Sequence, residues 1–188
     1  GGSSTQREHR DQTLYAWRRF GKFIEALTYL NDQVDGSLRF AQTPFLVLIG
    51  EAGIGKSHTI AHSIEEHLDR SAPAILLLGE YFQPGDPWKQ LITLLGLDCS
   101  GAEEFLGALE AAAEASGHRA LLVIDALNEH GVNVHRMWNR RLSGLRKTLS
   151  RFPHIAVLLS IRTPFEEVIL PKPIRHGPYL VHHAGFSG

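Results

Sequence analysis

The residue run from Gly50 to Ser57, Gly-Glu-Ala-Gly-Ile-Gly-Lys-Ser, matches the phosphate-loop pattern G-x-x-x-x-G-K-[ST] at every fixed position. Glycine lets the backbone of such a loop approach phosphate oxygens closely, so that several N–H groups point at them. We expect Lys56 to reach the β- and γ-phosphates of a nucleotide and the Ser57 hydroxyl to bind Mg²⁺. The residues expected to contact the nucleotide are Gly50, Glu51, Ala52, Gly53, Ile54, Gly55, Lys56, Ser57 and His58.

The segments on either side of this loop have the patterns that a phosphate loop requires. Residues 45–49 form a short apolar run, which is typical of a strand that is covered on both faces of a sheet. The residues from Lys56 to about Arg70 predict a helix, whose positive dipole end would lie at the phosphates. A chance match in a strand-to-helix turn is the alternative, but this context favours phosphate binding.

A carboxylate ends a second apolar run further along the chain. Residues 121–124 are followed by Asp125, at the end of a strand, where ligands collect in open α/β sheets. We expect Asp125 to hold Mg²⁺ together with Ser57, directly or through water. Glu129 is expected to orient or deprotonate the water that attacks the phosphate. The alternatives are that Asp125 caps a helix and that Glu129 is a solvated surface residue.

Arg162 follows a further apolar run, residues 155–160, which predicts the fourth strand. If this strand lies between the first and the third strand, Arg162 ends near the γ-phosphate, where it can sense or stabilise phosphate charge. A surface salt bridge is the alternative role of this arginine. The residues expected to act in catalysis are Lys56, Asp125, Glu129 and Arg162.

The elements that must position these side chains alternate along the chain. Buried strands are expected at residues 45–49, 74–78, 120–124 and 155–160, with a possible fifth at 179–182. Helices are expected at residues 56–70, 88–95, 102–115 and 134–150, and an N-terminal helix from Thr13 through Leu30. This alternation predicts an α/β fold of three layers, a P-loop NTPase fold with a mainly parallel five-stranded sheet.

The chain of 188 residues suits one ordinary domain. We expect residues 1–12 to be a polar leader or linker and residues 13–188 to form the P-loop NTPase domain. The sequence between Gly1 and Ser4 is typical of a linker, and an apolar run almost reaches the other end, so we expect a piece of a longer protein.

The bulk composition excludes several classes of protein. Hydrophobic residues make up 43% and charged residues 21% of the chain, which is typical of a globular protein. The net charge of −1 indicates neither a nucleic-acid nor a membrane partner, and the apolar runs are shorter than the roughly 20 residues that span a bilayer. The single cysteine, Cys99, fits a reducing cytosol, so we expect a cytoplasmic protein.

Missing motifs narrow the choice of nucleotide. The chain has no Asn-Lys-x-Asp segment for guanine, and Asp125 is not followed by the Asp-x-x-Gly pattern of GTPases, so we expect ATP or ADP. A small-molecule kinase is the alternative enzyme. A module that folds like an NTPase but lacks catalysis is the alternative from another class.

Two weaker patterns remain open. His58 and His62 lie four residues apart on a predicted helix, but no third metal ligand accompanies them, so solvated or core histidines are the simpler interpretation. A second predicted helix carries five basic residues, which form a solvated face or an oligomer or nucleic-acid contact. They are Arg136, Arg140, Arg141, Arg146 and Lys147.

Taken together, these residues resemble the STAND class of NTPases, in particular bacterial NACHT-like members of signalling and antiviral defence proteins. The similar segments are Phe45 to Thr59, Gly79 to Trp88, Leu121 to Glu129, Leu158 to Arg162 and His183 to Phe186. The resemblance implies a switch that hydrolyses ATP slowly, with Mg²⁺, and whose nucleotide state controls homo-oligomerisation in the full-length protein. It also implies helical and winged-helix regions, which have no counterpart in this sequence.

Overall fold

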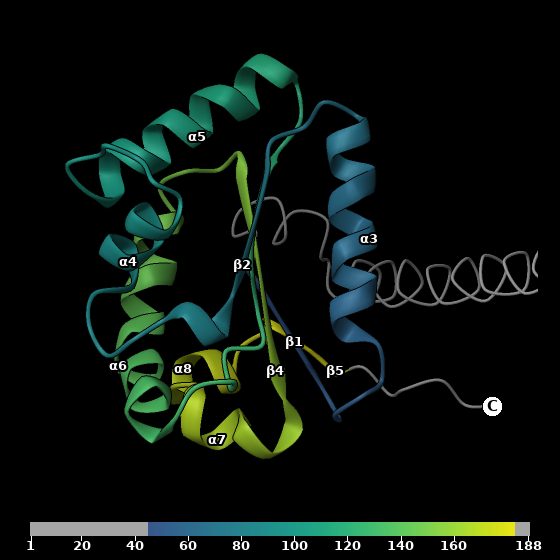
Figure 1. The fold of residues 1–188 in the computed structure, drawn as a ribbon, viewed down its shortest axis with the longest axis vertical. Coiled ribbons are helices and arrows are strands. Elements are labelled where there is room, and N and C mark those ends of the chain that lie inside the picture. Colours follow the sequence, from purple (N-terminus) through teal and green to yellow (C-terminus); the bar gives the residue numbers. More distant parts are fainter. Residues whose placement is uncertain (1–44, 183–188) are drawn as a thin grey trace, which may run out of the picture.

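Five strands form one sheet in the computed structural model of the chain, which describes residues 45–182 (Figure 1). They are β1 (Phe45–Gly50), β2 (Ala74–Leu78), β3 (Ala120–Asp125), β4 (Ile155–Arg162) and β5 (Leu180–His182). Their spatial order is β2-β3-β4-β1-β5, and every pair of neighbours is parallel. The fourth strand thus lies between the first and the third, as the position predicted for Arg162 requires.

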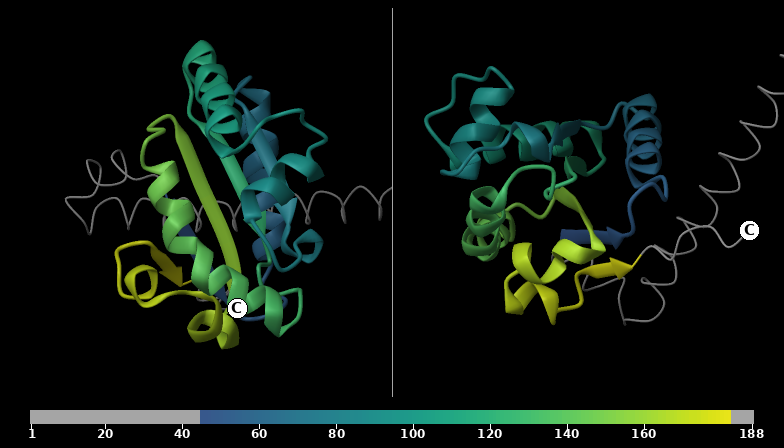
Figure 2. Two further views of the ribbon diagram at one scale, coloured as in Figure 1. Left: turned by 90° about the vertical axis from the view of Figure 1, so that its left-hand side faces the viewer. Right: turned by 60° about the horizontal axis from the view of Figure 1, so that its bottom comes forward.

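Helices cover both faces of this sheet. They are α3 (Lys56–Asp69), η1 (Gly79–Tyr81), α4 (Pro87–Leu94), α5 (Ala102–Ser116), α6 (Val132–Leu149), η2 (Thr163–Phe165), α7 (Glu166–Ile169) and α8 (Lys172–Arg175). The right-hand view of Figure 2 shows α3 on one side of the sheet and α4 and α6 on the other. The three-layer α/β prediction is confirmed, and the predicted elements agree with the observed ones to within two residues at each end.

Some predictions fall on residues that the structure does not describe. They are the polar leader 1–12, the N-terminal helix from Thr13 through Leu30, and the similar segment His183 to Phe186. Within residues 45–182, no helix has the length and the apolar character needed to cross a membrane.

Apolar side chains on each face of the sheet form two clusters. On the α3 side, Ile60 and Ile64 of the helix pack on strand residues that include Leu48 and Val123. The larger cluster lies on the opposite face, where Trp138 of α6 is fully buried. Its ring lies 5.0 Å from that of Phe82, between ring centroids, and this contact joins α6 to the segment after β2.

The end of β2 lies against the segment that follows β3. A Cβ atom built on Gly79 would lie 2.2 Å from the Ala126 carbonyl oxygen and 2.9 Å from the Leu127 Cα atom. Both are backbone atoms and cannot rotate away. Ala126 itself has a φ of 59°, a left-handed conformation that is uncommon without glycine. The close approach at Gly79 therefore helps to fix the path of the chain directly after Asp125.

We expect Gly79→Ala to lower the free energy of unfolding by about 1–3 kcal/mol, because the new methyl group would force two backbone segments apart. Urea unfolding followed by circular dichroism measures this change. Gly107→Ala is the matched control, because Gly107 lies exposed within α5 with nothing near its Cβ position. That variant should raise the stability by about 0.5–1 kcal/mol. An unchanged stability in Gly79→Ala would contradict the close approach.

Candidate functional site

The phosphate loop connects β1 to α3 at the carboxyl edge of the sheet. Gly53 and Gly55 have φ values of 75° and 88°, which L side chains rarely adopt, so glycine is required at both positions. Gly55 is also the N-cap of α3, and no side chain caps this end of the helix. The first N–H groups of α3 therefore remain available to an anion, as the pattern predicted.

Lys56 folds back onto its own loop. Its Nζ atom donates hydrogen bonds to the carbonyl oxygens of Gly50, at 2.8 Å, and of Glu51, at 2.7 Å. Burial lowers the pKa of Lys56, and the nearby Arg162 guanidinium lowers it further, while Asp125 and Glu51 act in the opposite direction. Burial and Arg162 thus disfavour the charged form of Lys56, and the negative charge of a phosphate group beside it would favour that form.

Asp125 ends β3 and is buried, with 4% of its surface exposed. The Ser160 hydroxyl donates a hydrogen bond to its Oδ1 atom, and the same hydroxyl accepts one from the Ala126 N–H at 2.8 Å. The Leu127 N–H donates to the Ser160 carbonyl oxygen at 3.0 Å. Ser160 of β4 therefore holds both the carboxylate and the chain that follows it.

Asn128 connects Glu129 and Arg162, the other two residues predicted to act in catalysis. Its Oδ1 atom accepts a hydrogen bond from the Arg162 N–H at 2.9 Å, and its Nδ2 atom lies 3.4 Å from a Glu129 carboxylate oxygen. The Arg162 guanidinium donates to that same oxygen in an ion pair. Both side chains keep a substantial exposed fraction, 43% for Arg162 and 37% for Glu129, so a ligand can reach them.

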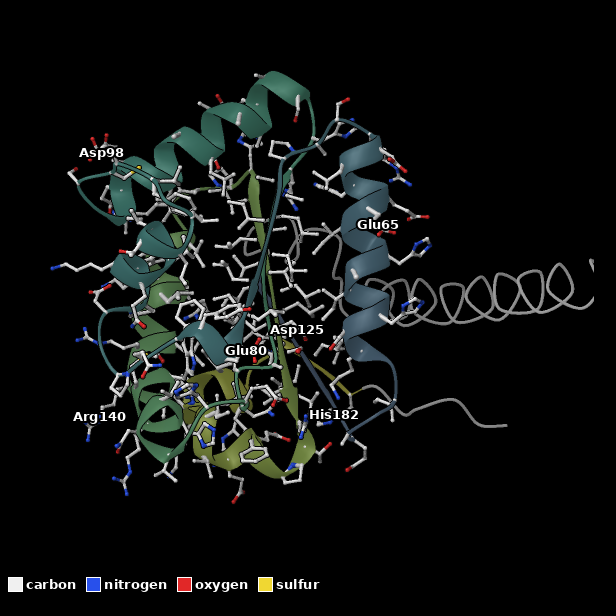
Figure 3. All side chains as sticks on the ribbon, in the orientation of Figure 1. Glu65, Glu80, Asp98, Asp125, Arg140 and His182 are labelled. Atoms are coloured by element: carbon white, nitrogen blue, oxygen red, sulfur yellow. The ribbon has the colours of Figure 1, made fainter. Side chains whose placement is uncertain are left out.

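One cavity of about 230 Å³ unites these groups. It is lined by Ala52, Gly53, Ile54, Gly55, Lys56, Ser57, His58, Asp125, Ala126, Asn128, Glu129, Ser160 and Arg162. The predicted residues that do not line it are Gly50 and Glu51, whose carbonyl oxygens hold Lys56 instead. Figure 3 shows Asp125 at the end of the strands, between α3 and α6.

Three residues of this cavity were not among the predicted site residues: Ala126, and the two polar residues Ser160 and Asn128. Both lie inside segments that the sequence had singled out, Ser-Ile-Arg and Asp-Ala-Leu-Asn-Glu, but their hydrogen bonds join residues more than 30 positions apart. The oxygen ligands that Mg²⁺ prefers are present, since the Ser57 hydroxyl and the Asp125 carboxylate line the same cavity. These two donors fit the predicted magnesium site.

The histidines of α3 do not form a metal site with each other. His58 lines the cavity, whereas His62 lies near the carboxylates of Glu65 and Glu66, each at 3.8 Å. Within residues 45–182, the one group with metal-ligand spacing is Glu110, Glu114 and His154, which contains neither of them.

A parallel sheet with β4 between β1 and β3, and a phosphate loop between β1 and α3, define a P-loop NTPase domain. Residues 39–167 match the model of the family described as the AAA domain. Since this match covers more than half of the chain, the chain belongs to the AAA domain family. Membership of this family implies nucleotide binding and NTPase activity.

Three solved structures are similar to this chain at low sequence identity. Cdc6p from Pyrobaculum aerophilum has a TM-score of 0.52 and 18% identity, and the alignment covers 86% of this chain and 44% of that one. AMPPCP-bound DnaA from Aquifex aeolicus has a TM-score of 0.44 and 18% identity, over 75% of this chain and 40% of that one. Drosophila ORC bound to DNA has a TM-score of 0.48 and 15% identity, and the alignment covers 87% of this chain and 90% of that one.

The chain therefore spans less than half the length of the Cdc6p and DnaA chains. No curated protein sequence matches it. The family match alone places the chain among AAA domains, and none of the comparisons shows the narrower STAND and NACHT-like resemblance.

We expect Ser160→Ala to lower the free energy of unfolding by about 1–3 kcal/mol, because the buried Asp125 carboxylate and the Ala126 N–H would each lose a partner. Ser150→Ala is the control, since the exposed Ser150 hydroxyl bonds only to the Lys147 carbonyl oxygen at the end of α6. It should change the stability by less than about 0.5 kcal/mol. Equal effects of the two substitutions in urea unfolding would contradict the role given to Ser160.

Proposed function

We propose that this domain binds ATP with Mg²⁺ in the cavity between the phosphate loop and the ends of β3 and β4, and that it hydrolyses ATP slowly. One observation carries the proposal: three segments far apart in the sequence bring Lys56, Asp125, Glu129 and Arg162 to a single cavity. Membership of the AAA family supports an ATPase over the small-molecule kinase that the phosphate loop alone also allows.

Different groups of the cavity would bind the phosphates and the Mg²⁺ ion. The N–H groups of the loop and of the first turn of α3 donate to phosphate oxygens, and Lys56 leaves the Gly50 and Glu51 carbonyls to reach them. Ser57 and Asp125 would hold Mg²⁺, which would add positive charge beside the phosphates. Ser160 keeps the Asp125 carboxylate in place through its hydroxyl.

Glu129 and Arg162 act as a pair that the γ-phosphate separates. In the structure the Arg162 guanidinium donates to one carboxylate oxygen of Glu129, so the two side chains are paired with each other. A γ-phosphate carries more negative charge than Glu129 and attracts the guanidinium away from it. Glu129 is then released to deprotonate the attacking water, while Arg162 stabilises charge on the phosphate. The exchange costs little, because a partly exposed ion pair contributes only about 0–1 kcal/mol.

Slow hydrolysis with a rearranging ion pair suits a switch better than a metabolic enzyme. The resemblance of residues 125–129 and 160–162 to NACHT-like STAND proteins supports a cytoplasmic switch, of a signalling or defence protein, whose nucleotide state controls homo-oligomerisation of the full-length chain.

We expect Lys56→Ala to weaken ATP binding by roughly ten- to a hundredfold, because a charged hydrogen-bond donor to phosphate contributes about 1.5–3 kcal/mol. Isothermal titration calorimetry with and without Mg²⁺ measures the affinity. The control is Lys89→Ala, which removes an exposed lysine of α4 outside the cavity and should bind ATP normally. An unchanged ATP affinity in Lys56→Ala would show that this loop does not bind the phosphates.

We expect Glu129→Gln to retain ATP binding while turnover falls by about 10²- to 10⁴-fold, the usual contribution of a general base. Release of phosphate under saturating ATP measures the rate. Glu65→Gln, on the exposed side of α3, is the matched control and should turn over normally. Normal hydrolysis by Glu129→Gln would show that another group activates the water.

A further inference from the structure

A second and larger hollow lies away from the proposed nucleotide cavity. It has a volume of about 410 Å³ and is lined by Pro84, Gly85, Asn133, Arg136, Met137, Arg140 and Arg141. We refer to these residues as the α6 groove. None of them lines the nucleotide cavity. Figure 3 shows Arg140 on the outer side of α6, on the side of the molecule opposite α3.

The groove carries three positive charges without a negative one. Arg136, Arg140 and Arg141 are exposed, and none of them forms an ion pair within residues 45–182. The whole of α6, residues 132–149, contains no aspartate or glutamate. Arg146 of the same helix is used differently, since it donates to the Tyr179 hydroxyl at 3.0 Å. The three groove arginines therefore present positive charge to the hollow with no ion-pair partner in the described residues.

The wall opposite these arginines is held in place by hydrogen bonds. The Gln90 side chain accepts from the Gln83 N–H at 2.6 Å and donates to the Gln83 carbonyl oxygen at 2.8 Å, so it closes the loop that contains Pro84 and Gly85. The Asp86 carboxylate caps α4 at the end of this loop.

A contact at the start of this loop ties the wall to α6. The Gln83 side-chain amide nitrogen lies 3.1 Å from Nε2 of His130, within hydrogen-bond distance, and His130 lies two residues before α6 begins. A groove whose two sides are already fixed loses little conformational entropy when a ligand binds.

A row of charges on a helix is by itself typical of a solvated face. The α6 groove differs from a solvated face in three ways. The arginines line a hollow, the opposite wall is held by hydrogen bonds, and no carboxylate in the described chain forms an ion pair with these arginines. Each guanidinium presents a planar fork of donors that matches a carboxylate or a phosphate.

We propose that the α6 groove binds an acidic peptide segment of a partner protein. The lining favours a peptide over a nucleic acid, because it has no aromatic ring on which a base can stack, and stacking supplies much of single-strand binding. Met137, Pro84 and Gly85 instead offer an apolar floor and wall to a neighbouring apolar side chain.

The test uses the chain as it stands and a fluorescein-labelled peptide of glutamates with one leucine. We expect anisotropy to show binding that weakens as salt is raised, since the pairs are partly exposed. Arg140→Glu and Arg136→Glu should each weaken binding by about tenfold or more, because a like charge would then face the peptide. Lys147→Glu makes the same charge change on an exposed residue of α6 outside the groove, and it should bind the peptide as the unchanged protein does.

Three results would overturn the proposal. One is equal loss of binding in Lys147→Glu and Arg140→Glu, which would indicate a diffuse charge effect. Another is tight binding of a labelled oligodeoxythymidylate, with none of the peptide, which would assign the groove to nucleic acid. The third is self-association that Arg140→Glu abolishes, in sedimentation without peptide, which would assign the groove to a second copy of the chain. ATP affinity, measured in the same variants, should stay unchanged because the two sites share no lining residue.

Discussion

The insertion of β4 between β1 and β3 is the constraint on which the site depends. In the register of β1 and β4, Gly50 lies opposite Arg162, so the first residue of the phosphate loop and the arginine are neighbours. In the register of β3 and β4, Ile124 pairs with Leu159, which brings Ser160 to Asp125. A slip of one residue would turn these side chains to the opposite faces of the sheet.

The short segment after β3 transmits this arrangement to the rest of the domain. Its backbone bonds to Ser160, its Asn128 side chain bonds to the Arg162 N–H, and Gly79 packs against Ala126 from the end of β2. His135 of α6 adds a hydrogen bond from its Nε2 atom to the Asn128 carbonyl oxygen at 3.1 Å. The segment after β3 is therefore in direct contact with β4, α6 and the end of β2.

The sequence was informative wherever a local pattern sets the structure. The apolar runs predicted the strands, and the glycines at 53 and 55 predicted the loop, because both depend on backbone chemistry within a few residues. The roles of Ser160 and Asn128 were not predictable, since their partners lie more than 30 residues away. A salt bridge was the alternative role predicted for Arg162, and the structure shows one, but its partner, Glu129, lies 33 residues away and was not predictable. The helices α7 and α8 were missed because each has only four residues, too few for a periodic pattern.

The basic residues of α6 show the same limit. The sequence revealed the charges, but the loop that faces them comes from a segment about 50 residues earlier, and only the fold makes a groove of the two. The central claim remains that the cavity holds the phosphates of a nucleotide. Calorimetric titration of the chain with ATP, ADP and AMP in the presence of Mg²⁺ tests it most directly. If the loop binds phosphates, ATP and ADP should bind and AMP should bind far more weakly or not at all. Equal affinity for all three nucleotides would contradict phosphate recognition by this cavity.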